Sequence, residues 1–146
     1  MGMKNKYDLS CNIAQTLNII GDRWTLLIIH EIFLGKKTYK ELELNLNGIA
    51  SNLLSNRLKE LEKDGIILSE LYQEHPRRYA YSITEKGKDL REVFNSIILW
   101  GHKYLEVCYK EIVDKSTKDP VKLVYYNSKT NQILSSDEIE IREVSK

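Results

Sequence analysis

Amide, hydroxyl and amine side chains recur at helical spacing between residues 51 and 64. On a helix of about 100° per residue, the leucines of this segment share one face, which predicts a buried stripe of Leu54, Leu58 and Leu61. The centre of the opposite face carries no acid, and its asparagines can hydrogen-bond base edges while its lysines can bind phosphates. The pattern predicts a helix that contacts duplex DNA. The candidate contacts are Ser51, Asn52, Ser55, Asn56, Arg57, Lys59 and Lys63.

A second basic cluster follows between two segments that alternate polar and apolar residues. His75, Arg77 and Arg78 surround Pro76 at this point. Arginine on a projecting loop can enter a minor groove or bind a phosphate. Taken singly, this cluster could be an ordinary turn and the helix could be a solvated surface helix with internal ion pairs. Both features on one chain, in this order, favour DNA binding.

The two cysteines, Cys11 and Cys108, are far apart in the chain. They form no CxxC pair, which argues against a zinc site or a disulfide framework. Cys11 lies near the N-terminus of the first expected helix, where a thiolate is favoured, although Asp8 opposes this effect. Cys11 is therefore either a reactive thiol or a structural residue at a dimer contact. Cys108 lies on an apolar stripe and is expected in the core.

Nothing in the sequence predicts catalysis. The histidines His30, His75 and His102 lie on different expected elements, and no phosphate loop, HExxH or GxSxG motif occurs. We therefore expect no enzyme, no metal and no cofactor.

Hydrophobic periodicity and capping signals predict the elements that position these residues. Asp22 is the expected cap of the second helix, Thr38 of the third, through a capping box with Glu41, and Ser51 of the fourth. The expected order is helices over 9–20, 24–34, 38–46 and 51–64, a β-hairpin over 66–84, and one long helix over 85–112. A second, polar hairpin is expected after residue 113, with its turn near residues 129–131.

This order predicts an α+β fold that is mainly α, a winged helix-turn-helix in which the fourth helix enters the major groove. We expect dimerisation helices at both ends, a DNA-binding and dimerisation domain over residues 1–112, and an extra C-terminal β-hairpin over 113–146 that packs on it. The length of 146 residues and the near-neutral net charge of +1 suit one such domain with a local basic surface. The N-terminus has no signal-like apolar stretch, so we expect a cytoplasmic protein without a membrane partner.

The chain resembles the HxlR family of winged-helix regulators, which is related to the MarR group. The matching motifs run from Cys11 to about Trp100 and include Gly21-Asp22-Arg23-Trp24, Gly48-Ile49-Ala50-Ser51, LSNRLKELEKDG, Pro76-Arg77-Arg78, Tyr81-Ser82-Ile83-Thr84 and Lys86-Gly87. The resemblance implies a homodimeric transcription factor that binds an inverted repeat through the LSNRLKELEKDG helix and the wing. Some relatives sense electrophiles or oxidants at a cysteine in the place of Cys11. The tail after about Lys110 departs from the family pattern.

A dimer would place two reading helices one helical turn of DNA apart. The first and the long terminal helix carry more apolar surface than a small core needs, at Leu17, Phe94, Ile97, Ile98, Trp100, Tyr104 and Leu105. The alternative is that the terminal helix only closes its own domain. The predicted function is DNA-binding regulation controlled by an electrophile or a small ligand; the competing hypothesis is a winged-helix protein-interaction module that does not bind DNA.

Overall fold

The computed structural model describes residues 6–107 and 110–144. Cys108, expected in the core, lies outside these residues. The chain separates into two compact units, residues 1–94 and 95–146. This division falls earlier in the chain than the domain boundary expected near residue 112. No helix within the described ranges is long and apolar enough to cross a membrane.

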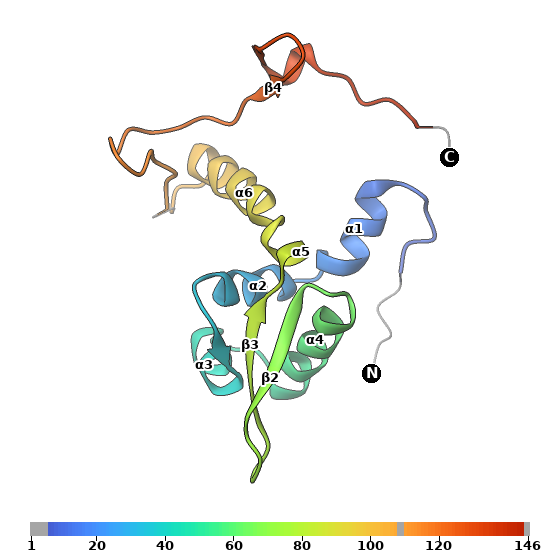
Figure 1. The fold of residues 1–146 in the computed structure, drawn as a ribbon, viewed down its shortest axis with the longest axis vertical. Helices are drawn as coiled ribbons and strands as arrows, with labels where there is room; N and C mark the ends of the chain where they lie inside the picture. The colour runs from blue at the N-terminus through green and yellow to red at the C-terminus, as the bar shows by residue number, and fades with distance from the viewer. Residues whose placement is uncertain (1–5, 108–109, 145–146) are drawn as a thin grey trace. The chain divides into compact units, whose positions relative to one another are not determined.

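Four helices of the first unit precede its main hairpin (Figure 1). They are α1 (Asn12–Ile20), α2 (Thr25–Phe33), α3 (Tyr39–Asn45) and α4 (Ser51–Lys63). The prediction that the first helix begins at Leu9 is wrong. The Gln15 side chain donates to the carbonyl of Leu9, and the backbone N–H of Tyr7 donates to Asn18 Oδ1 at 2.8 Å, so these bonds tie residues 7–9 to the side of α1.

The caps of α2 and α4 differ from those expected. The N-cap of α2 is Trp24, although Asp22 still stabilises this turn by accepting from the backbone N–H groups of Trp24 at 2.9 Å and Thr25 at 3.1 Å. The N-cap of α4 is Ala50, which makes no side-chain cap bond. Ser51 is instead the first residue of α4, and its hydroxyl donates to Glu43 Oε1 at 2.6 Å.

The expected capping box at the start of α3 is confirmed. The backbone N–H of Glu41 donates to the Thr38 hydroxyl, and the backbone N–H of Thr38 donates to the Glu41 carboxylate at 2.7 Å. The backbone N–H and the hydroxyl of Thr38 both donate to the Glu41 carboxylate and keep the pKa of Glu41 below its ordinary value.

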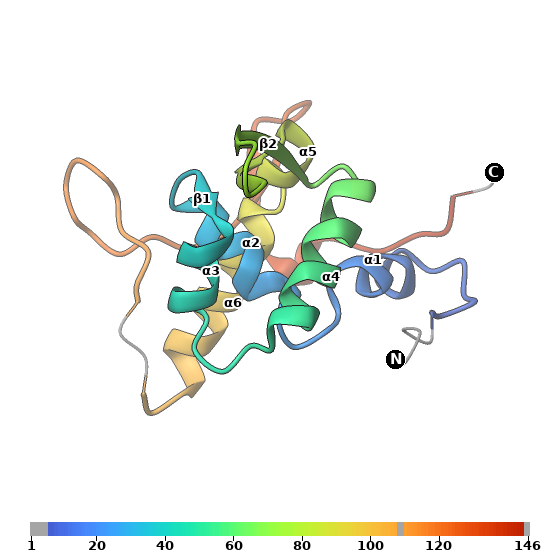
Figure 2. The ribbon, with the colours of Figure 1, turned by 90° about the horizontal axis from the view of Figure 1, so that it is seen from below.

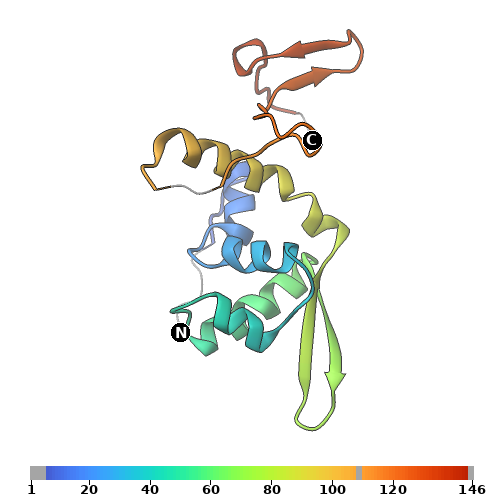
Figure 3. The ribbon, with the colours of Figure 1, turned by 90° about the vertical axis from the view of Figure 1, so that its left-hand side faces the viewer.

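A three-stranded antiparallel sheet completes the winged fold. Its order is β1 (Lys37–Thr38), β3 (Arg78–Ile83) and β2 (Ile67–Gln73). β2 and β3 form the expected hairpin, called the wing from here on, and its tip projects away from α2, α3 and α4 (Figure 3). The pairing of Lys37 with Tyr81 was not foreseen, because two residues are too few to show an alternating pattern.

The core of the first unit lies where α2, α3 and α4 meet (Figure 2). Leu54, Leu58 and Leu61 are all buried, so the predicted inner face of α4 is confirmed. Ile28, Ile29 and Ile32 of α2 face them in the same cluster. α2 is not buried on every side, since Leu27 is exposed.

The predicted long helix over 85–112 is two helices, α5 (Glu85–Lys88) and α6 (Arg91–Tyr104). The Thr84 hydroxyl accepts from the backbone N–H of Gly87 at 3.0 Å, and the N–H of Leu90 donates to the Gly87 carbonyl at 3.1 Å. Each of these two hydrogen bonds joins residues three positions apart. Between them α5 ends, and α6 then begins along a new helix axis. Phe94 then packs edge-on against Phe33 of α2, with ring centroids 5.4 Å apart.

The second unit contains a small antiparallel ladder in the expected tail segment. β4 (Tyr125–Asn127) pairs with β5 (Gln132–Leu134), and Asn127 Oδ1 accepts from the backbone N–H of Lys129 in the turn between them. A single 3-10 turn, η1 (Ser136–Glu138), follows.

Candidate nucleic-acid interface

The outward side of α4 presents the predicted polar residues. Asn52, Lys59 and Lys63 are exposed, and Asn56 is half-buried. Within the described part of the chain, neither Lys59 nor Lys63 has a carboxylate within ion-pair distance. Of the two internal ion pairs that the surface-helix alternative predicts, Arg57–Glu60 is present and Lys59–Glu62 is not. Both ammonium groups therefore remain open to an external anion.

Two predicted contact residues make hydrogen bonds inside the helix-turn-helix. The hydroxyl of Tyr39 in α3 donates to the carbonyl of Ser51 at 2.8 Å, and Ser55 Oγ donates to the Tyr39 hydroxyl at 3.3 Å. Tyr39 thus joins α3 to the first turn of α4 and sets the angle between the two helices. No pattern in the sequence indicates these hydrogen bonds.

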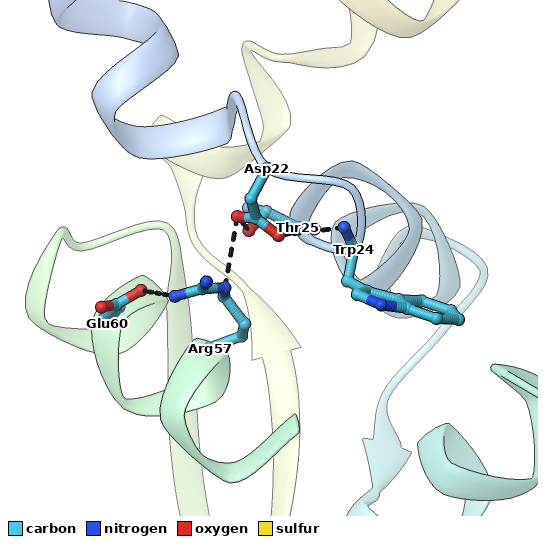
Figure 4. Close-up of polar contacts among 5 residues, drawn as sticks. All are labelled: Asp22, Trp24, Thr25, Arg57 and Glu60. Carbon is cyan, nitrogen blue, oxygen red and sulfur yellow. Dashed lines mark hydrogen bonds and ion pairs between the residues drawn. The ribbon is translucent and has the colours of Figure 1, made fainter. Parts of the chain in front are cut away.

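Arg57 lies against carboxylates of its own unit (Figure 4). Its Nε lies 3.3 Å from Asp22 Oδ2, its Nη1 lies 2.6 Å from Glu60 Oε2, and its side chain is 16% exposed. Two carboxylates therefore occupy the guanidinium, which argues against the predicted DNA contact for Arg57. The side chain instead joins α4 to the turn between α1 and α2.

Asp22 is the centre of that connection. One carboxylate oxygen accepts the N–H groups that begin α2, and the other accepts the Thr25 hydroxyl and faces Arg57 (Figure 4). The Asp22 side chain is only 15% exposed, so water screens these interactions little. Thirty-five positions separate the two ion-pair partners, and no periodic pattern in the sequence could have revealed them.

The wing tip carries the second predicted cluster. His75 and Arg77 lie in the turn between β2 and β3, Arg78 opens β3 opposite Gln73, and all three side chains are exposed. The Gln73 amide donates to the His75 carbonyl at 3.1 Å and braces the turn. Within the described residues, the two arginines have no carboxylate partner.

The Cys11 thiol is free and exposed at the N-cap of α1. The backbone N–H groups of Ala14 and Ile13 lower the pKa of Cys11 below its ordinary value. These N–H groups can stabilise a thiolate because the first N–H groups of a helix have no partner inside the helix. The local geometry thus favours a nucleophilic thiolate.

Most of the predicted dimer residues are exposed in the single chain. The exposed fraction is 40% for Leu17, and in α6 it is highest for Trp100 at 61%. Ile97, Tyr104 and Leu105 are also exposed, and Ile98 is half-buried. Phe94 differs from the rest, because it is half-buried and lies against Phe33 within its own unit.

Comparisons with known proteins agree with this architecture. The sequence model of the HxlR-like helix-turn-helix family matches residues 19–109. The HTH-type transcriptional regulator YdeP of Bacillus subtilis is 35% identical over 105 residues, which are 72% of this chain and 78% of YdeP. The regulator YodB of the same organism is 36% identical over 103 residues, which are 68% of this chain and 92% of YodB.

Two solved structures extend the likeness to three dimensions. The crystal structure of PA1607, a candidate transcription factor, has a TM-score of 0.76 and 25% identity, and the match covers 94% of this chain and 97% of PA1607. That coverage reaches well into the segment after α6. The redox regulator HypR in its oxidised form has a TM-score of 0.60 and 32% identity, over 66% of this chain and all of HypR.

The family and the curated relatives are transcriptional regulators and not enzymes. The helix-turn-helix and the wing both lie within the matched residues 19–109. This chain belongs to the HxlR-like helix-turn-helix family and is a DNA-binding transcriptional regulator of the HxlR type.

Proposed function

We propose that this regulator binds an inverted-repeat operator as a homodimer, with α4 in the major groove and the wing tip against the neighbouring backbone or minor groove. One observation carries the proposal: Lys59 and Lys63 of α4 and the two arginines of the wing tip are exposed and, within the described residues, have no acidic partner. Unpaired cations release counterions when they meet phosphates, which supplies binding free energy. A chain with a net charge of only +1 needs such a local concentration.

The proposed division of roles follows the exposure of each side chain. Asn52 and Asn56 read base edges, Lys59 and Lys63 meet phosphates, and the residues of the wing tip meet the backbone or the minor groove. Ser51 and Ser55 hold the helix-turn-helix together through hydrogen bonds with Glu43 and Tyr39. Their contacts with DNA are secondary to this role. Arg57 leaves the contact set because Asp22 and Glu60 occupy it.

The proposed dimer uses α1 and α6. Exposed apolar side chains of this size favour burial against a partner, at about 25 cal/mol per Å² of apolar surface. Ile97, Trp100 and Tyr104 of α6 are each about half exposed or more. Trp100 and Tyr104 also lie together, with ring centroids 5.3 Å apart, and offer a preformed aromatic surface to a second copy.

The proposed signal is oxidation of the Cys11 thiol or its reaction with an electrophile. This would take place in the cytoplasm, where a regulator has access to the chromosome. The support is the exposed thiol with its lowered pKa, together with the likeness to HypR, which is described as a redox regulator. Control by a small ligand is the alternative signal.

The test is a DNA-binding titration on a duplex from the region upstream of the protein's own gene. Binding is measured before and after treatment with mild diamide, and Cys11→Ser is the control variant. The proposal expects tight binding to that duplex, weaker binding to a scrambled duplex, and a diamide response that Cys11→Ser removes. Equal, weak binding to both duplexes would contradict operator recognition. Tight binding that ignores diamide would contradict the redox signal alone.

A further inference from the structure

A hollow of about 340 Å³ lies between α4 and the wing. α4 contributes Ser55, Leu58, Lys59 and Glu62, while Ser69 of β2 and Tyr79 and Tyr81 of β3 form the opposite wall. Except for Leu58, every lining residue carries a hydroxyl, ammonium or carboxylate group. None of the three wing residues belongs to the contact set predicted from the sequence.

Charge is distributed unevenly along the hollow. Glu62 lies at the base of the wing, because its Oε1 accepts the Ser69 backbone N–H at 3.2 Å and also the Ser69 hydroxyl. Ser69 pairs with Tyr81 in the sheet, which places that tyrosine at the same end. We call this the acidic end.

The other end of the hollow lies nearer the wing tip and the start of α4. Ser55 is seven positions before Glu62, about 10 Å along a helix. Tyr79 is two positions closer to the tip than Tyr81, about 7 Å along a strand. Lys59 lies on the α4 wall four positions after Ser55 and three before Glu62. We call the part of the hollow beyond Glu62, which Ser55, Lys59 and Tyr79 line, the outer end.

We propose that the outer end of the hollow binds a backbone phosphate of DNA through the Lys59 ammonium and the Tyr79 hydroxyl. The inference rests on the proposed DNA binding and adds Tyr79 as a phosphate contact. A strand held there would lie between the helix in the major groove and the cationic wing tip. One phosphate would then fix the register of α4 in the groove, since backbone contacts set position and base contacts set sequence.

The chemistry of each end favours this placement. Among the described residues, the Tyr79 hydroxyl has no hydrogen-bond partner and Lys59 has no ion-pair partner, so both can donate to an anionic oxygen. The acidic end is unsuitable for an anion. Burial and the charge of Glu62 raise the pKa of Tyr81 above its ordinary value. A phosphate is therefore confined to the outer end.

The test compares Tyr79→Phe with Tyr72→Phe, which removes an exposed hydroxyl from the same wing at a position outside the hollow. Each full-length variant is titrated with the upstream duplex and with a scrambled duplex over a range of salt concentrations. We expect Tyr79→Phe to weaken binding to both duplexes by roughly three- to tenfold and Tyr72→Phe to leave both unchanged. Lys59→Gln should also reduce the slope of log affinity against log salt by about 0.9 per chain.

The outcomes separate this inference from the proposed function. If the wild-type protein prefers the upstream duplex but Tyr79→Phe and Lys59→Gln keep its affinity and salt slope, the phosphate site is wrong and DNA binding stands. A loss confined to the upstream duplex would also overturn the site, because a phosphate contact carries no sequence preference. If the wild-type protein binds neither duplex, the proposed function fails first.

Discussion

The Arg57 guanidinium lies 3.3 Å from the Asp22 carboxylate, measured from Nε to Oδ2, and joins the recognition helix α4 to the turn between α1 and α2. The same carboxylate caps the start of α2. The position of α4 therefore depends on a residue outside the helix-turn-helix itself, and α1, which carries Cys11 at its N-cap, leads directly into that turn.

Asp22→Ala should lower the free energy of unfolding by about 1–3 kcal/mol, because it removes the cap and leaves a largely buried guanidinium with one partner fewer. Asp22→Asn should cost less, since an amide oxygen can still accept the capping N–H groups. Urea unfolding followed by circular dichroism measures both. Glu70→Gln is the matched control: its exposed pair with Lys36 should contribute less than about 0.5 kcal/mol. A loss for Asp22→Ala no larger than for this control would contradict the structural role.

Gly87→Ala should destabilise the first unit by about 1–3 kcal/mol. A Cβ at this position would lie 2.3 Å from the Ile66 carbonyl oxygen and 2.5 Å from Ile83 Cδ1, so the backbone would have to shift. Thermal unfolding of Gly87→Ala and of Lys88→Ala, an exposed change on the same short helix, provides the comparison. Equal melting temperatures for the two variants would show that α5 does not pack as closely as described.

The Cys11 thiol should react with iodoacetamide at a lower pH than an ordinary cysteine, whose pKa is about 8.5. The backbone N–H groups of Ala14 and Ile13 stabilise the thiolate, so the pKa is lowered and the reactive form is present at a lower pH. The rate is measured against pH in a Cys108→Ser background, first folded and then in urea. The midpoint should rise on unfolding. An unchanged midpoint would contradict stabilisation by the helix start.

Ile97→Glu should convert a dimer into a monomer, because it places a charge in the proposed apolar contact of α6. Light scattering coupled to size exclusion measures the mass. Leu44→Glu is the control, since Leu44 is 70% exposed on α3, which is not one of the proposed dimer helices. A dimer that survives Ile97→Glu, or a monomeric wild-type chain, would contradict the proposed assembly.

Local signals in the sequence were sufficient for much of the first unit. The leucine spacing of α4, the Thr38–Glu41 capping box and the alternating strands of the wing each depend on neighbours within a few residues, and each occurs as expected. The errors involve competition between local and distant partners. Ser51 could have capped its own helix but donates to Glu43 instead, and Thr84 caps a helix that ends after one turn.

The candidate site was predictable in composition but not in detail. Helical spacing identified the outward face of α4, yet it could not show that Arg57 turns toward Asp22 or that Tyr39 binds Ser51 and Ser55. Nor could it place Tyr79 and Lys59 in the walls of one hollow, because that arrangement depends on how the wing packs against α4. Contacts of this kind depend on how whole elements pack together, so no periodic pattern in the sequence reveals them.

DNA binding by α4 and the wing is tested most directly by titrating a labelled upstream duplex with wild-type protein and two variants. One variant combines Arg77→Ala with Arg78→Ala, and the other combines Asn52→Ala with Asn56→Ala. Lys129→Ala with Arg142→Ala removes the same charge from the second unit as a control. We expect the arginine variant to lose at least about tenfold in affinity on any duplex. The asparagine variant should lose about 1–3 kcal/mol per base contact on the upstream duplex and little on a scrambled one, and the control should bind normally. Wild-type affinity in both test variants would contradict the proposed interface.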